Sequence, residues 1–311
     1  RNFYTSHKVM SQINMEGTDL FLPNSANLIV EGTPSLKQNG RTLGISTEQG
    51  SASTIRVGAF HPYLCYEAEF SALSDNEEVG ITFYPNEGAG KRIRIVYRNG
   101  EIVSLANDEM LARKSIGECD KVSLRVQYTG VRFHVFNLRE NGDADLLYSV
   151  ENDMRAVESC TTHSFGIYAN GNITLHKAQS ALTCGTGQAD PQIIQTTDGQ
   201  PLIRDGRLYI CFTTRGFERI FDSYQGIYSL DLASYELRLE GAMFFGKGDG
   251  LMYGFHATKV VYNPSTEEFL VMTTTHEDTH TLAFCSTKSD LLHGLHFLEC
   301  EELDFPHNYT R

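Results

Sequence analysis

Hydrophobic and polar residues alternate along most of the chain. In residues 122–128, VSLRVQY, apolar side chains occupy every second position and polar ones occupy the positions between them. The earlier pattern in residues 92–98, RIRIVYR, places three apolar residues on one face of a strand and three arginines on the other. A period of two puts the apolar side chains on one face of an extended strand, so both segments predict half-buried β-strands.

Short turn signals separate these strand patterns. Asn99-Gly100 joins two of them, and an Asn-Gly pair readily takes the positive φ angles of a tight hairpin. Asn170-Gly171 joins two others near the middle of the chain. Only residues 107–115 are compatible with a helical turn. The sequence therefore predicts an all-β protein made of a sandwich or a barrel.

Residues 1–182 contain about a dozen strand patterns, which suit two stacked sheets with alternating inward side chains. The segments GRTLGIST, YEAEFSA, EEVGITFYPN and FGIYANGNITLHKAQ make this half resemble the concanavalin-like jelly-roll sandwiches that accompany many carbohydrate-active enzymes. The resemblance implies either a sugar-binding module or a purely structural support for its neighbour, and both remain open.

Residues 183–311 form a second predicted domain, which begins with a run of small residues and contains an internal repeat. Residues 209–214 and 269–274 occupy matching places in two copies, each with four strand patterns. A repeated four-stranded unit is typical of a propeller blade, and two blades cannot close a propeller. We therefore expect the first two blades of a β-propeller completed by a second polypeptide or a downstream fragment. An open sheet packed on the sandwich is the alternative.

The segment ADPQII, residues 189–194, resembles the start of the five-bladed propeller glycoside hydrolases, such as families 43, 32, 117 and 143. The resemblance implies that Asp190 faces a central funnel and acts as general base or nucleophile. Glycoside cleavage needs a second carboxyl group as general acid, which the resemblance places on a later blade outside this chain. The alternative for Asp190 is a turn-forming residue before a proline.

The same resemblance suggests substrate-binding residues. The run 256–259, His-Ala-Thr-Lys, stands where the family carries an acidic residue, so Lys259 is a departure from the pattern. With Arg215 it favours a carboxylated substrate, such as a uronic or ulosonic sugar. Lys259 on a solvated rim is the alternative. His256 and His276 are expected to donate hydrogen bonds to sugar hydroxyls, and Tyr224 to stack on a sugar.

Composition limits the partners. The formal net charge of −13 disfavours a nucleic-acid partner, since phosphate binding needs a clustered basic face. No apolar run is long enough to span a membrane, and no signal peptide is recognisable at residue 1. Seven cysteines without a C-x-x-C pair predict buried free thiols and no zinc site. A structural calcium ion remains possible.

Two functions from different classes follow. The first is a secreted glycoside hydrolase, periplasmic or extracellular, that acts on a polysaccharide-derived, acidic sugar. The second is a non-catalytic, lectin-like carbohydrate-binding module. A purely structural interaction protein is a third possibility.

Overall fold

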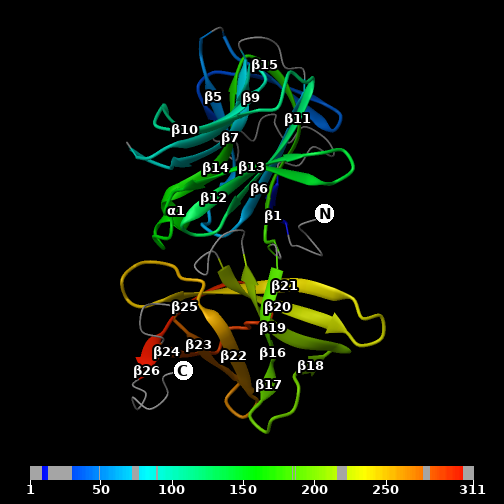
Figure 1. The fold of residues 1–311 in the computed structure, drawn as a ribbon, viewed down its shortest axis with the longest axis vertical. Coiled ribbons are helices and arrows are strands. Elements are labelled where there is room, and N and C mark those ends of the chain that lie inside the picture. Colours follow the sequence, from blue (N-terminus) through cyan, green and yellow to red (C-terminus); the bar gives the residue numbers. More distant parts are fainter. Residues whose placement is uncertain are drawn as a thin grey trace.

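The protein is built almost entirely from β-strands. The computed structural model describes residues 9–12, 30–48, 50–71, 77–88, 90–183, 185, 187–215, 223–275 and 281–303. The described residues hold one helix, the single-turn α1 (Ser159–Thr162). The all-β prediction is therefore confirmed. A sandwich forms one part of the molecule, and two smaller sheets lie against one end of it (Figure 1).

The first sheet of the sandwich has the order β13-β12-β11-β6-β15-β4-β3, with β1 also paired to β15. Its strands are β1 (Val9–Gln12), β3 (Ser35–Asn39), β4 (Thr42–Ser46), β6 (Cys65–Ser71), β11 (Lys121–Tyr128), β12 (Arg132–Leu138), β13 (Ala144–Glu151) and β15 (Asn172–Ala181). Every neighbouring pair in it is antiparallel.

The second sheet of the sandwich has the order β10-β9-β8-β7-β14-β5-β2, again antiparallel. Its strands are β2 (Val30–Glu31), β5 (Ser53–Ala59), β7 (Glu78–Pro85), β8 (Ile93–Arg98), β9 (Glu101–Ala106), β10 (Glu109–Ser115) and β14 (His163–Asn170). The chain passes from this sheet to the first one at Gly171, whose φ is 123°. A Cβ atom there would lie 2.4 Å from the side chain of Glu77, so the crossing favours glycine.

The core of the sandwich lies between the two sheets. The inward side chains of β7 and β11 are each at most 1% exposed: Val79, Ile81, Phe83, Val122, Leu124 and Val126. Aromatic rings fill the space beside them, with the ring centroid of Phe83 5.3 Å from that of Phe60 and 5.1 Å from that of Tyr128. The predicted sandwich is confirmed, because the period-two pattern supplies one apolar layer from each sheet.

The helical turn expected in residues 107–115 is wrong. Asn107 and Asp108 have φ angles of 45° and 72° and form the tight turn between β9 and β10. Strand β10 then runs antiparallel to β9 at the edge of its sheet. Most of its side chains are exposed, so the segment has no buried stripe to hold a helix against the core.

The second half of the chain forms two smaller sheets. The first has the order β16-β19-β20-β21-β25, with β18 paired to β19; the second has the order β17-β22-β23-β24-β26. The strands are β16 (Gly187–Ile193), β17 (Gln195–Thr196), β18 (Ile203–Arg204), β19 (Arg207–Arg215), β20 (Ser223–Asp231), β21 (Leu237–Gly246), β22 (His256–Asn263), β23 (Glu268–Thr274), β24 (Leu282–Thr287), β25 (Gly294–Glu299) and β26 (Glu301–Leu303).

The predicted propeller blades find no support in these sheets. A blade is a separate antiparallel sheet in a closed ring, whereas the described sheets are open and share strands between the two copies of the repeat. Strand β25 of the second copy pairs parallel with β21 of the first, from Gly241 opposite Gly294 to Gly246 opposite Glu299. Strand β17 in turn pairs parallel with β22.

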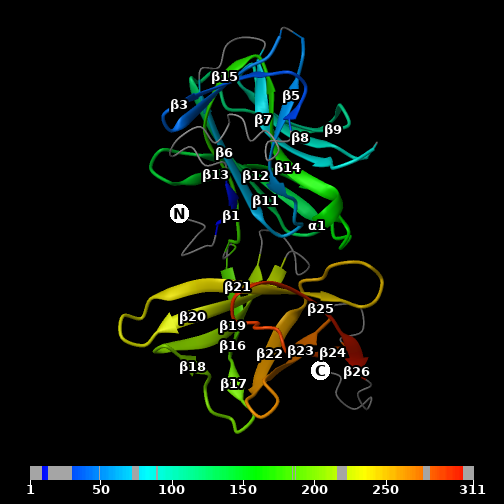
Figure 2. The ribbon, with the colours of Figure 1, turned by 180° about the vertical axis from the view of Figure 1, so that it is seen from behind.

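The two halves of the chain share a hydrophobic contact. The ring of Phe244, in β21, lies 4.9 Å from Tyr63 and 4.8 Å from His61, measured between centroids. Tyr63 donates a hydrogen bond from its hydroxyl to the carbonyl oxygen of Met252 at 3.0 Å. Figure 2 shows β21 on the side of the lower sheets that faces the sandwich. The apolar layer of β21 therefore continues the core of the sandwich.

His134 provides a test of the core at acid pH. Its side chain is fully buried, and burial, with a smaller effect from Arg132, lowers its pKa to about 4. An unfolded histidine titrates near 6.5, so the neutral folded form contributes stability above that pH, and this contribution is lost as the pH falls toward 4. We expect His134 to account for about 3 kcal/mol of acid destabilisation between pH 7 and 4.

Denaturant unfolding at several pH values checks this expectation. His134→Gln should flatten the fall of unfolding free energy below pH 6.5. An equal acid dependence in His134→Gln and the unaltered protein would contradict the assignment.

Candidate functional site

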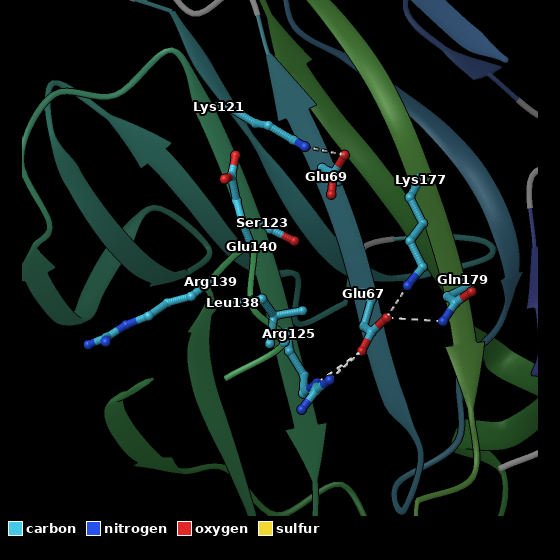
Figure 3. Close-up of a pocket in the computed structure, with 11 residues that line it drawn as sticks. Glu67, Glu69, Lys121, Ser123, Arg125, Leu138, Arg139, Glu140, Lys177 and Gln179 are labelled. Carbon is cyan, nitrogen blue, oxygen red and sulfur yellow. Dashed lines mark hydrogen bonds and ion pairs between the residues drawn. The ribbon is translucent and has the colours of Figure 1, made fainter. Parts of the chain in front are cut away.

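A polar groove of about 670 Å³ lies on the outer face of the first sandwich sheet. Its lining comes from strands β6, β11 and β15 and from the end of β12 with the turn that follows. The lining residues, most of which Figure 3 labels, are Glu67, Glu69, Lys121, Ser123, Arg125, Leu138, Arg139, Glu140, Gly142, Lys177 and Gln179. We call this surface the polar groove.

The strand period explains why these side chains meet. On β6 the alternate residues Tyr66, Ala68 and Phe70 are buried in the core, so Glu67 and Glu69 point to the opposite face. The register then places Arg125 of β11 and Gln179 of β15 directly beside Glu67. The polar groove is therefore the outward face of the three strands whose inward face builds the core.

Glu67 is the centre of the groove. Its side chain is 6% exposed, Arg125 Nε donates a hydrogen bond to Oε1 at 2.9 Å, and a terminal nitrogen of Arg125 forms an ion pair with the same oxygen at 2.8 Å. The other oxygen, Oε2, accepts hydrogen bonds from Lys177 Nζ at 2.5 Å and from Gln179 Nε2 at 3.0 Å. Both carboxylate oxygens are thus fixed by donors from the two flanking strands (Figure 3).

The electrostatics keep this carboxyl group ionised. Burial by itself raises the pKa of Glu67, but the charges of Arg125 and Lys177 and their hydrogen bonds outweigh it and lower the pKa below the ordinary value. A carboxylate held in this way cannot supply the proton that a glycosidase needs for its leaving group. Glu67 is suited to orient its neighbours and to accept hydrogen bonds.

The rim of the groove carries further paired charges. Lys121 Nζ lies 2.9 Å from Glu69 Oε1. Arg139 donates two hydrogen bonds to the carboxylate of Asp145, at 2.6 and 2.9 Å. Ser123 stands between these pairs on the floor formed by β11. The lining side chains are polar apart from Leu138, so the groove offers hydrogen bonds rather than apolar surface to a ligand.

The structure brings two of the sequence-predicted site residues together. Asp190 lies at an irregularity of β16 with a φ of 51°, and its carboxylate is 3.8 Å from the guanidinium of Arg215. Their side chains are 39% and 45% exposed. The catalytic role expected for Asp190 depended on a propeller funnel, which the structure does not support. The binding role of Arg215 stays a prediction.

Of the other predicted site residues, Tyr224 lines a small pocket together with Arg215. Tyr224 is 4% exposed and packs against Phe244, and His256 is 3% exposed, with Nε2 3.2 Å from Ser223 Oγ. Lys259 donates hydrogen bonds to Gln195 Oε1 at 2.6 Å and to the carbonyl oxygen of Ile193 at 3.4 Å. His276 lies outside the described residues. The binding roles of these four residues stay predictions.

Sequence reasoning missed the polar groove. Its residues occur in segments that were recognised as strands, YEAEFSA, VSLRVQY and the end of FGIYANGNITLHKAQ. The available signal was the charged residues on the outward face of these strands. The alternation shows that Glu67 and Arg125 both point away from the core, but only the strand order shows that they are neighbours.

Clusters of metal-ligating side chains and membrane-spanning helices are absent from the described residues. They contain no group of three or more His, Cys, Asp or Glu side chains that could hold a metal ion. In the same part of the chain no helix has the length and apolarity to cross a membrane. The prediction of buried free thiols is confirmed for Cys65, Cys211 and Cys285, whereas the free thiols of Cys119, Cys160 and Cys300 are half-buried and Cys184 lies outside the described residues.

Comparison with known proteins finds similar folds only among solved structures. No family model and no curated protein matches the chain. A seed lectin of Lotus tetragonolobus is 11% identical, has a TM-score of 0.41, and the match covers 54% of this chain and 96% of the lectin. The potassium-bound carbohydrate recognition domain of Emp46p is 11% identical, with a TM-score of 0.40 and coverage of 55% and 95%. The exoplasmic/lumenal domain of VIP36, bound to Ca²⁺ and Man3GlcNAc, is 11% identical, with a TM-score of 0.38 and coverage of 50% and 85%.

These findings correct the expected resemblance to propeller glycoside hydrolases. The three structures are a lectin, a carbohydrate recognition domain and a glycan-bound domain, and the sheets of residues 187–303 are open where they are described. The predicted hydrolase, which depended on the propeller, is therefore wrong. At this level of similarity the comparisons assign no ligand to the chain.

Glu67 gives the groove a stability test. Glu67→Gln leaves the buried guanidinium of Arg125 without its countercharge, which we expect to cost about 3 kcal/mol of unfolding free energy. The matched control is Glu69→Gln, since Glu69 forms a partly exposed pair with Lys121, and its replacement should cost less than about 1 kcal/mol. Urea unfolding at neutral pH measures both. Equal costs would show that the Glu67 network does not carry the expected energy.

Proposed function

We propose that this protein binds carbohydrate in the polar groove without cleaving it. The observation that carries the proposal is the fixed set of donors and acceptors around Glu67, formed by Arg125, Lys177 and Gln179. Sugar hydroxyls are both donors and acceptors, so they match a site in which each polar group already has a set direction. Because these groups are held in place before a ligand arrives, binding costs little side-chain entropy.

The size and shape of the groove support a small oligosaccharide. Ligand sites commonly enclose about 300–1,000 Å³, and the groove has about 670 Å³. Ser123 lies on its floor, with Lys121 and Arg139 at the rim. A small oligosaccharide placed along β11 would therefore reach the hydroxyl, ammonium and guanidinium donors of all three residues.

The charge pattern favours an uncharged glycan. The four cations of the lining, Lys121, Arg125, Arg139 and Lys177, are balanced by Glu67, Glu69 and Glu140 of the same lining and by Asp145, which pairs with Arg139. The groove and this partner therefore carry no excess positive charge that would attract a carboxylate selectively. The acidic sugar expected from the sequence rested on Arg215 and Lys259, which do not line this groove.

The catalytic chemistry of a glycosidase does not suit this surface. Hydrolysis requires one carboxyl group that is protonated near neutral pH and a second that is ionised. Glu67, the buried carboxyl of the groove, has a lowered pKa, accepts three hydrogen bonds and forms an ion pair with a terminal nitrogen of Arg125. Because the carboxylate of Glu67 holds the neighbouring donors in place, it suits the binding of a glycan without cleavage.

We also propose that residues 1–182 and 183–311 are two domains with a shared interface. Each described sheet takes its strands from one side of this boundary only, which supports the division. The second polypeptide expected to complete a propeller has no support in the described sheets. A structural calcium ion and a periplasmic or extracellular location stay predictions.

The binding proposal is tested with immobilised neutral oligosaccharides and their uronate-containing counterparts. We expect the labelled protein to bind a subset of the neutral glycans and to release no new reducing ends from them. Ser123→Phe, which fills the floor of the groove, should weaken binding of the best glycan at least about tenfold, a loss of about 1.4 kcal/mol.

The matched control is Ser289→Phe, at an exposed position outside the groove. It should bind as the unaltered protein does, and calorimetric titration gives both affinities. Unchanged binding in Ser123→Phe would place the ligand elsewhere. Release of reducing ends, or binding of uronate glycans alone, would contradict the proposed function.

A further inference from the structure

Two cysteines meet where the last two strands of the second small sheet pair. The register of β24 and β26 runs from Leu282 opposite Leu303 to Phe284 opposite Glu301. The next step of this antiparallel register places Cys285 opposite Cys300. Residues directly opposite one another have Cα atoms about 4.5–5.5 Å apart, which lies within the range of about 4.4–6.8 Å that a disulfide spans.

The packing keeps both side chains at this meeting point. Cys285 is 8% exposed and belongs to the hydrophobic cluster that fills the two small sheets, and Cys300 packs against the same cluster. The backbone N–H of Cys300 is fixed by a hydrogen bond to the carbonyl oxygen of Gly246 at 3.0 Å. Both cysteines carry free thiols in this structure.

We infer that Cys285 and Cys300 form a redox-sensitive disulfide site that joins β24 to β26 under oxidising conditions. The oxidant is a small-molecule disulfide such as glutathione disulfide. The two protein thiols lose two electrons and two protons, and the small disulfide takes them up to give two glutathione thiols.

The thiols have unequal roles in this exchange. A hydrogen bond from the Cys300 thiol lowers the pKa of Cys285, and the same hydrogen bond, together with burial, raises the pKa of Cys300. The Cys285 thiolate attacks one sulfur of the small disulfide and releases the first glutathione as a thiolate, which is then protonated. Cys300 then loses its proton and attacks the Cys285 sulfur, which forms the protein disulfide and releases the second glutathione.

The cross-link joins more than one strand pair. The segment that it encloses contains β25, and β25 belongs to the other small sheet through its pairing with β21. A bond between Cys285 and Cys300 therefore links the short strand β26 to β24. It also joins the two ends of the segment that leaves this sheet, pairs with β21 through β25 and returns. We expect the oxidised form to be the more stable one.

Peptide mapping tests the inference directly on the full chain. Trypsin cleaves after Lys259, Lys288 and Arg311, so the two cysteines fall on separate peptides, residues 260–288 and 289–311. After treatment with glutathione disulfide and blocking of the remaining thiols, we expect one linked species, two hydrogens lighter than the sum of both peptides. Recovery of both peptides with blocked thiols, or with one glutathione each, would overturn the inference.

Thermal unfolding gives a second measurement. The melting temperature of the oxidised protein should exceed that of the reduced protein by about 5 °C. Cys300→Ser should lose both the linked peptide and this difference, whereas the control Cys160→Ser should keep them. A linked peptide without a rise in melting temperature would overturn the stabilising role of the bond.

Discussion

The buried carboxylate of Glu67 imposes the main constraint on the sandwich. An ionised group that is 6% exposed must be surrounded by donors, and β6 lies between two strands that can provide them. Arg125 comes from one neighbour, and Lys177 and Gln179 come from the other. A slip of either strand by one residue would move these side chains to the core face and bring apolar ones outward. The charge thus fixes the register that also aligns the hydrophobic layer.

Local patterns in the sequence were enough to predict most strands. The turn at Asn99-Gly100 joins β8 to β9 with positive φ angles at both residues, as the dipeptide predicts. Residues 107–115 were interpreted as a possible helical turn because an exposed edge strand lacks the alternation of apolar and polar residues that marks its neighbours. The propeller prediction for the second half was wrong because the strand patterns do not show which strands pair with one another. Strand β25 of the second copy pairs with β21 of the first.

The groove could be predicted only in part. Residues that point outward can be recognised from the alternation on β6 and β11, but the hydrogen bonds of Glu67 join residues 58, 110 and 112 positions apart. Such contacts depend on strand order, which no local motif specifies. Asp190 shows the opposite error, since a short motif suggested a catalytic position although the structure gives it an exposed pairing with Arg215.

The parallel pairing of β21 with β25 also affects how the second half is synthesised. Strand β21 is complete at Gly246, whereas its partner ends at Glu299. During translation, the outer edge of β21 therefore emerges from the ribosome with its N–H and C=O groups unpaired. These groups find their partners only after about fifty more residues, up to the end of β25, have been synthesised. Over that interval the nascent chain presents an open strand edge, so the sheet that contains β21 can be completed only after β25 has been synthesised.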